Sequence, residues 1–297
     1  KMKVGYWTSG FSLGFGAVME QMKFAEKEGV DVEWVKFSEV NGPTRALPSH
    51  AIDLAFGAPS ATSMAIASDG IPVKIVLATQ IAESQFVVLA DSPIKSMADL
   101  KGKKIAVAPG SAVWFAWAMT LVENNIPYNI FNAVNIQGGG TAFVQALKRG
   151  DIDAMLSWEP FESQIVAEDA AYFATKLVDY SKSKAVGSEL GLLAASGESY
   201  AKRREVIKRF LWAYLNAEAK LAADSNAFIN AYSQFTGLPL EVTRESHKLI
   251  KLGGVLDKAQ VARLAEASFK QGVIKTDVTK EAADLFDDSL AKEIRGR

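Results

Sequence analysis

Short apolar runs alternate with amphipathic segments along most of the chain. Apolar runs bounded by turn residues predict buried strands, and amphipathic segments with three- and four-residue spacing predict helices. A regular alternation of the two predicts an α/β fold in which mostly parallel sheets are flanked by helices. The expected strands are Lys3–Tyr6, Val32–Lys36, Ile52–Phe56, Val73–Leu77, Phe86–Ala90, Lys104–Val107, Ala133–Ile136, Asp153–Ser157 and Gly191–Ala195.

A weak internal repeat divides this pattern into two halves. Each half contains a helix end, a buried strand and a loop opened by proline, a residue that suits the first turn of a helix. The segments are Arg45-Ala46-Leu47, Ile52-Asp53 and Gly57-Ala58-Pro59, followed about one hundred positions later by Gln145-Ala146-Leu147, Ile152-Asp153 and Trp158-Glu159-Pro160. The repeat predicts two lobes with one plan, although α/β units also resemble one another through shared physics alone.

Two such lobes would form a binding cleft between them. Open parallel sheets bind small molecules outside the carboxyl ends of their strands. Each loop at that edge leads into a helix N-terminus, where unpaired N–H groups and the helix dipole favour an anion. Ser60 and Ser111 stand where a hydroxyl would either contact a ligand or cap its own helix. The four loops are Trp7–Phe15, Gly57–Ala61, Pro109–Trp114 and Ser157–Phe161.

Aromatic side chains crowd three of these loops. They are Trp7, Phe11, Phe15, Trp114, Phe115, Trp158 and Phe161. Apolar walls with a few polar groups are typical of small-molecule sites, so these rings could enclose the organic part of a ligand. Ordinary core packing is the alternative, and we favour it for Phe15, Phe115 and Trp117 but not for Trp7 or Trp158.

Composition narrows the function further. With 297 residues, of which 49% are hydrophobic, the chain can bury cores for two lobes. The 33 basic and 34 acidic residues leave a formal charge of -1, so nucleic acid is not an expected partner. The absence of cysteine excludes disulfides, thiol catalysis and cysteine-ligated metal. No apolar run reaches the ~18 residues of a membrane span.

The C-terminal third supports a scaffold role. An apolar stripe at three- and four-residue spacing predicts a helix with one buried face. Its members are Val206, Ile207, Phe210, Leu211, Tyr214, Ala217 and Leu221. The basic residues opposite are expected to be solvated, with a docking surface for a membrane permease as the alternative. These are Lys202, Arg203, Arg204, Lys208 and Arg209.

Several segments resemble the periplasmic binding proteins of aliphatic sulfonate, taurine and nitrate ABC importers. The similar segments lie between Lys3 and about Val166, and Trp158-Glu159-Pro160 points to the sulfonate and taurine group. The others are Val32–Phe37, Arg45-Ala46-Leu47, Asp91–Ser96 with Leu100–Val107, and Gly150–Asp153.

The resemblance implies the type II periplasmic binding protein fold, a clamshell joined by two crossover strands near Ser84–Ala90 and Leu190–Ala195. Lobe 1 would comprise residues 1–90 and 190–297, and lobe 2 residues 91–189. It also implies export with removal of the signal peptide. The mature protein would be periplasmic or, in a Gram-positive organism, a lipoprotein at the cell surface. The expected partners of this monomer are a small anionic ligand and an ABC permease, without cofactor or metal.

The family's anion-contacting loops fall on four places in this sequence, and the aromatic argument adds Trp7, Phe11 and Trp114. The first loop departs from the family pattern because it is rich in glycine and phenylalanine, which leaves a bulkier aromatic acid as an alternative to a sulfonate. The expected ligand-binding residues are Trp7, Thr8, Ser9, Phe11, Ala58, Ser60, Ala61, Gly110, Ser111, Ala112, Trp114, Trp158 and Glu159.

An enzyme is the alternative function, because the same fold hosts proteins resembling thiamine-pyrimidine and menaquinone-precursor synthases. The sequence offers little catalytic chemistry: His50 and His247 fall in or beside predicted helices away from the cleft, and no HExxH, GxSxG or CxxC pattern occurs. Glu159 is more simply an acceptor for a ligand ammonium or a lobe-closing contact than a general base. We therefore expect no catalytic residues. A signalling or receptor module with the same clamshell is a third alternative, and such a module usually needs a fused partner domain.

Overall fold

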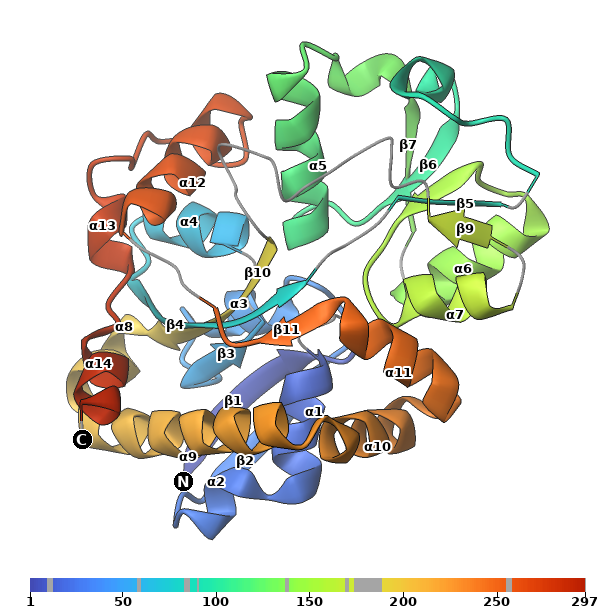
Figure 1. The fold of residues 1–297 in the computed structure, drawn as a ribbon. Coiled ribbons are helices and arrows are strands. Elements are labelled where there is room, and N and C mark those ends of the chain that lie inside the picture. Colours follow the sequence, from blue (N-terminus) through green and yellow to red (C-terminus); the bar gives the residue numbers. More distant parts are fainter. Residues whose placement is uncertain are drawn as a thin grey trace.

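The structure is a computed structural model that describes residues 1–9, 13–57, 60–82, 86–89, 91–136, 139–168, 171–173, 189–254 and 258–296. Two β-sheets, each covered by helices, form the two parts of the molecule (Figure 1). We call the part around the six-stranded sheet lobe 1 and the part around the five-stranded sheet lobe 2. The expected α/β class is confirmed.

The six-stranded sheet has the order β11-β4-β10-β3-β1-β2, and the five-stranded sheet has the order β7-β6-β8-β5-β9. All nine expected strands are present, and two short edge strands, β9 and β11, are additional. The strands of lobe 1 are β1 (Met2–Trp7), β2 (Val32–Phe37), β3 (Leu54–Phe56), β4 (Val73–Ala82), β10 (Glu189–Ser196) and β11 (Ile250–Leu252). Those of lobe 2 are β5 (Phe86–Leu89), β6 (Lys104–Val107), β7 (Asn132–Asn135), β8 (Ala154–Leu156) and β9 (Ala171–Phe173).

Strand pairing is mixed in both sheets. Parallel pairing joins β1 to β2 and β3 in lobe 1, and β6 to β7 and β8 in lobe 2. The next strand in each sheet, β10 beside β3 and β5 beside β8, runs antiparallel. The sheets are therefore less parallel than expected, and the parallel part of each one is a unit of three strands.

The two parallel units share one hydrogen-bond plan, which gives the internal repeat a structural meaning. Asp53 accepts a hydrogen bond from the Lys3 amide at 2.8 Å, and Asp153 accepts one from the Lys104 amide at 2.7 Å. In the return direction the amides of both aspartates donate to the carbonyls of Lys3 and Lys104 at 2.8 Å. Each aspartate thus fixes the start of its strand against the central strand.

Helices cover the sheets and fill the cores. In lobe 1 the predicted C-terminal stripe lies on the long helix α9, where Ile207, Phe210, Tyr214 and Leu221 are buried against the strands. In lobe 2 the helices are α5 (Ala112–Glu123), α6 (Gly140–Arg149) and α7 (Phe161–Ala167). Lobe 1 carries α1 (Leu13–Met22), α2 (Phe24–Lys27), α3 (Gly42–Ala46), α4 (Ser60–Ser68), α8 (Gly197–Lys202), α9 (Arg204–Ala223), α10 (Ser225–Thr236), α11 (Leu240–Lys248), α12 (Lys258–Lys270), α13 (Ala282–Leu285) and α14 (Ser289–Arg295).

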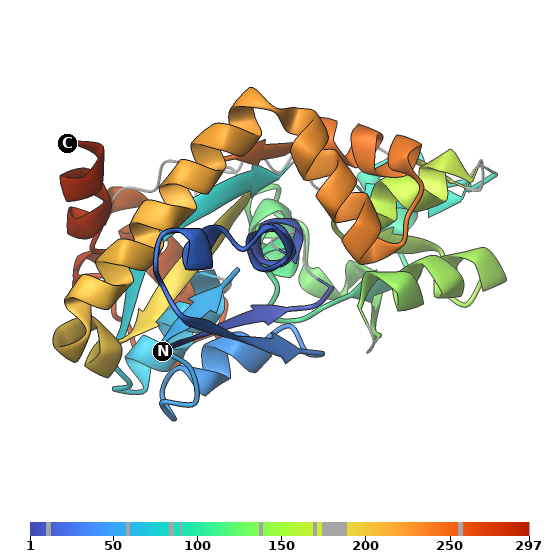
Figure 2. The ribbon, with the colours of Figure 1, turned by 90° about the horizontal axis from the view of Figure 1, so that it is seen from below.

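The C-terminal helices of lobe 1 reach across to lobe 2. Figure 2 shows the orange helices α9 to α11 forming an arch whose far end lies beside the yellow-green α7. Two short 3-10 helices, η1 (Met97–Leu100) and η2 (Tyr128–Ile130), complete the described elements. Within the described ranges, no helix combines the length and apolarity needed to cross a membrane.

Candidate functional site

A cavity of about 210 Å³ lies between the lobes, where the parallel strands end. Loops after β1 and β2 form the wall on the side of lobe 1, and loops after β6, β7 and β8 form the wall on the side of lobe 2. This is the edge at which open parallel sheets bind small molecules. The lining residues are Trp7, Ser38, Glu39, Val40, Asn41, Arg45, Ala108, Pro109, Asn135, Ile136, Gly139 and Trp158.

Two tryptophans close one side of the cavity. The rings of Trp7 and Trp158, one from each lobe, have centroids 4.8 Å apart at an angle of 57°. Trp158 is only 1% exposed and also packs against Phe143, with ring centroids 5.4 Å apart. Trp158 therefore belongs both to the cavity wall and to the core of lobe 2.

Ser9 joins the lobes beside this pair. Its carbonyl accepts a hydrogen bond from the Trp158 Nε1, and its hydroxyl accepts one from the Gly140 amide at 3.0 Å. The Gly140 amide opens α6, so the hydroxyl satisfies one of the amides that a helix N-terminus leaves without an intrahelical partner. Ser9 is a point where lobe 1 holds two segments of lobe 2.

Glycines allow the close approach of the lobes. A Cβ atom on Gly139 would lie 2.1 Å from the Ser9 hydroxyl oxygen, and one on Gly110 would lie 2.7 Å from the Asn41 Nδ2. Both glycines also have positive φ angles, 77° and 88°, which side chains with a Cβ rarely adopt. The contact between lobes depends on the absence of a side chain at these two positions.

The charged wall of the cavity comes from the loop after β2 and from α3. Glu39 and Arg45 line the cavity, and neither has an ion-pair partner among the described residues. Asn41 and Asn135 add carboxamides from opposite lobes. None of these four residues is among the ligand-binding residues expected from the sequence. Because β2 and β7 end at the same edge as β1 and β6, the rule of strand ends indicates these segments of the chain, but it does not indicate which of their side chains face the cavity.

Apart from Trp7 and Trp158, none of the expected ligand-binding residues that the structure describes is among those that line the cavity. Thr8 donates its hydroxyl to the Phe37 carbonyl at 3.0 Å, and Ser111 accepts from the Trp114 amide at 3.1 Å as the cap of α5, whose first residue is Ala112. The Trp114 indole donates to the Tyr128 hydroxyl at 2.8 Å. Phe11 and Ala58 lie outside the described residues, as do the side chains of Ser60 and Ala61. Ligand contact by these residues stays a prediction.

Glu159 follows Trp158 but does not line the cavity. It is 1% exposed, and its Oε2 accepts a long hydrogen bond from the Ser163 amide at 3.4 Å. Burial raises the pKa of this carboxyl to about 7. The acid is therefore placed behind the cavity wall, where α7 meets the C-terminal helices of lobe 1.

Comparison with known proteins places the chain in a family. A model of the family described as NMT1/THI5 like matches residues 18–227. The chain belongs to the NMT1/THI5 like family. The resemblance to periplasmic binding proteins expected from the sequence is confirmed by the relatives and structures described next.

Curated relatives of this NMT1/THI5-like protein include the taurine-binding periplasmic protein of Escherichia coli (strain K12), which is 32% identical over 139 residues. That match covers 46% of this chain and 42% of the relative, so it spans less than half of the relative's length. A putative binding protein of Brucella abortus (strain 2308) is 25% identical over 245 residues, covering 79% of this chain and 71% of its own.

Solved structures with the same fold include two binding proteins. The alkanesulfonate-binding protein SsuA of Xanthomonas axonopodis pv. citri, bound to MOPS, has a TM-score of 0.81 at 19% identity, covering 96% of this chain and 97% of its own. The periplasmic nitrate-binding protein NrtA of Synechocystis PCC 6803 has a TM-score of 0.79 at 15% identity, covering 99% and 88%. At these identities the likeness shows the fold alone.

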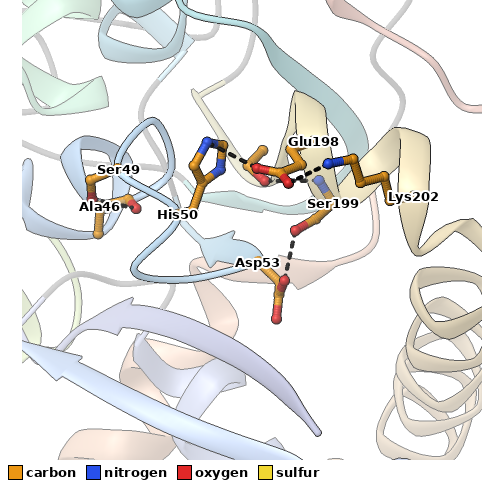
Figure 3. Close-up of polar contacts among 8 residues, drawn as sticks. Ala46, Ser49, His50, Asp53, Glu198, Ser199 and Lys202 are labelled. Carbon is orange, nitrogen blue, oxygen red and sulfur yellow. Dashed lines mark hydrogen bonds and ion pairs between the residues drawn. The ribbon is translucent and has the colours of Figure 1, made fainter.

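One structural neighbour of the NMT1/THI5-like chain is an enzyme, so catalytic groupings matter. The desulfurization enzyme DSZB has a TM-score of 0.67 at 17% identity and covers 100% of both chains. A serine, a histidine and two acids do gather in lobe 1, before β3 and around α8 (Figure 3). They are Ser199, His50, Asp53 and Glu198.

This polar cluster is arranged as a structural brace. His50 Nε2 pairs with Glu198 at 3.0 Å, whereas the Ser199 hydroxyl donates to Asp53 at 2.6 Å, so the histidine and the serine engage different acids (Figure 3). Lys202 donates to Glu198 at 2.7 Å, and this hydrogen bond lowers the pKa of Glu198. The cluster lies at the amino end of β3, opposite the cavity. Among the described residues no group of acids and histidines is arranged to hold a metal ion.

Proposed function

We propose that this chain is the solute-binding component of an ABC importer, which closes its two lobes over a small organic anion and leaves the ligand chemically unchanged. The observation that carries the proposal is the cavity between the lobes, lined from both sides by loops at strand ends and flanked by the contacts of Ser9 and Trp158. The taurine-, alkanesulfonate- and nitrate-binding proteins among its relatives and neighbours support the ligand class.

The cavity limits the size and chemistry of the ligand. With a volume of about 210 Å³, the cavity has room for a small molecule. Arg45 supplies a cation for a sulfonate or carboxylate, and the indoles of Trp7 and Trp158 supply an apolar surface for its organic part. The same wall would accept the organic part of a compact sulfonate or of an aromatic acid, and the screen below distinguishes them.

The proposed mechanism is closure of a clamshell. A ligand that contacts loops of both lobes only when they are closed shifts the equilibrium toward the closed form. In this proposal the chain passes between the two lobes near residues 91 and 189. The protein acts as a monomer outside the cytoplasm, and an ABC permease recognises its closed form.

The test is a thermal-shift and calorimetric screen of the purified chain. Taurine, short alkanesulfonates, nitrate, small carboxylates, aromatic sulfonates and pyrimidine precursors are the compounds, because a ligand selective for the native state raises the melting temperature. We expect one anion class to raise it and to be recovered unchanged. No shift with any anion would contradict the binding function, and conversion of a compound would favour the enzyme.

A further inference from the structure

The residue after Trp158 contacts a different part of the molecule. While Trp158 lines the cavity, the carboxyl of Glu159 is buried where α7 of lobe 2 packs against α11 of lobe 1. Figure 1 shows α11 passing directly beneath α7, with α10 beside it. The interface that buries Glu159 is therefore a second contact between the lobes, on the far side of the tryptophan.

The side chains around this carboxyl are polar but incompletely bonded. Ser246 on α11 and Tyr232 on α10 face it: the Ser246 hydroxyl lowers the pKa of Glu159, and burial, followed by the Glu159 charge, raises the pKa of Tyr232. The atoms Glu159 Oε1, Ser246 Oγ and Tyr232 OH are all buried and have no hydrogen-bond partner among the described residues. These groups do not replace the hydrogen bonds that an ionised carboxylate would receive from water.

The charged groups on the surrounding helices do not neutralise it either. On α7 the nearest titratable side chain is a second buried acid, Glu162. On α11 it is His247, which packs on Phe228 and whose pKa is lowered by burial. The cations nearby bond elsewhere: Arg244 to Asn226, Lys248 to Glu245, Lys148 to Glu168 and Arg149 to Asp151.

We propose that the proton is a second ligand of this protein, and that closing α7 onto α10 and α11 takes up one proton at the Glu159 carboxyl. The proposal rests on the proposed function, because it takes lobe closure as the step that retains the solute. Solute binding and proton binding then strengthen each other, since two ligands that favour the same state are reciprocally coupled.

The direction of the pH effect follows from the two states. In the closed form burial raises the pKa of Glu159 to about 7, and in an open form with the carboxyl in water the value would be about 4.3. Between these values closure binds close to one proton, so it weakens as pH rises, by up to about tenfold per pH unit. Above about pH 7 both forms are ionised and the effect levels off.

The test with a solute is a calorimetric titration with taurine between pH 5 and pH 8. We expect the affinity of the wild type to fall by roughly tenfold or more from pH 5 to pH 7 and then to level off. Glu159→Gln, a neutral residue of the same shape, should bind with little pH dependence. The same slope in Glu159→Gln, or a flat wild-type curve, would overturn the proposal.

Matched variants identify the carboxyl. Glu168→Gln at the exposed end of α7 and Glu162→Gln one turn from Glu159 should both keep the slope. Ser246→Ala removes a hydroxyl that lowers the pKa of Glu159, so the pH at which the curve levels off should rise. If Glu162→Gln loses the pH dependence and Glu159→Gln keeps it, the proton binds at Glu162 and the proposal is rejected.

A measurement without solute separates this proposal from the proposed function. Small-angle scattering of the ligand-free chain should show the radius of gyration increasing from pH 5 to pH 7 in the wild type but not in Glu159→Gln. If taurine fails to bind, this pH-dependent opening still supports the proton site. Identical curves for both proteins would overturn it, whatever solute the cavity holds.

Discussion

Single residues decide what the cavity can attract. Arg45 is the cation in the described wall, and it has no ion-pair partner among the described residues that would compete with a ligand. Its neighbour Glu39 carries the opposite charge, so the wall offers a site for an anion and a site for a cation. Selectivity for a small anion is thus expected to depend on one guanidinium.

Arg45→Gln should weaken the binding of taurine or a short alkanesulfonate about 10- to 100-fold. Hydrogen bonds to charged groups contribute about 1.5–3 kcal/mol, and the variant removes the charge. Isothermal titration calorimetry measures the loss, with Arg263→Gln on the exposed face of α12 as the control. Equal affinities of the two variants would remove Arg45 from the site.

Asp53 shows how one side chain stabilises lobe 1. Its carboxylate accepts from the Lys3 amide at 2.8 Å and the Ser199 hydroxyl at 2.6 Å, and pairs with Arg203 at 2.6 Å. Partial burial alone would raise the pKa of Asp53, but these hydrogen bonds and the Arg203 charge lower it below its ordinary value.

Asp53→Asn should reduce the free energy of unfolding at pH 7 by about 1–3 kcal/mol, because the amide cannot satisfy the same donors. Since the folded pKa lies below the unfolded one, this contribution is present above about pH 4 and is lost as pH falls further. Urea denaturation at pH 7 and pH 3 tests both statements. The exposed Asp151→Asn is the control, and equal stabilities of the two variants at pH 7 would contradict the prediction.

At the scale of elements, α6 is positioned by a glycine at each end. Gly139 precedes the helix with φ 77° and Gly150 follows it with φ 75°. A Cβ atom on Gly139 would meet the Ser9 hydroxyl oxygen at 2.1 Å, whereas one on Gly150 would meet nothing within 4 Å. The two glycines have the same backbone requirement, and of the two only Gly139 lies in the contact between lobes.

This pair allows a matched experiment on lobe closure. Gly139→Ala and Gly150→Ala should each cost about 1 kcal/mol of stability, because alanine is strained at positive φ. The clash with Ser9 should in addition reduce ligand affinity about tenfold or more in Gly139→Ala, while Gly150→Ala binds as the wild type does. Thermal unfolding measures the loss of stability, and calorimetry measures the loss of affinity. A loss of affinity in both variants would show that the clash with Ser9 is not its cause.

The elements that the sequence pattern missed are the short strands at the sheet edges. β9 and β11 have three residues each and pair with a single neighbour, so they carry too few apolar positions to form a pattern. The central strands β1, β3, β6 and β8 were predictable because burial on both faces requires continuous apolar runs. Pairing direction was less predictable, since it depends on where the chain crosses between lobes.

At the scale of the whole molecule, the position of the cavity could be predicted, whereas much of its lining could not. Trp7 and Trp158 were expected in the cavity wall because they stand at the ends of β1 and β8, although Trp158 also packs in the core of lobe 2, a role that was not favoured for it. Glu39, Asn41 and Asn135 were missed because a polar residue in a loop has no pattern that separates a cavity wall from an ordinary surface. Their position becomes visible only when the two sheets face each other.

The contact of Trp7 with Trp158 should make closure visible in tryptophan fluorescence. Closing the lobes brings the two rings together, so a ligand that closes them should change the emission of the wild type. Trp158→Phe should lose most of this change, while Trp212→Phe, on the exposed face of α9, should keep it. A change that persists in Trp158→Phe would show that it arises elsewhere.

The charges of the cavity are divided unequally between its two walls. Glu39 and Arg45 both belong to lobe 1, whereas the lining residues of lobe 2 that the structure describes are uncharged: Ala108, Pro109, Asn135, Ile136, Gly139 and Trp158. We therefore expect a charged solute to bind first to the charged residues of lobe 1, before lobe 2 closes over it. The association rate constant should depend on ionic strength, because the charges are on lobe 1. The dissociation rate constant should depend on how often the uncharged wall of lobe 2 opens.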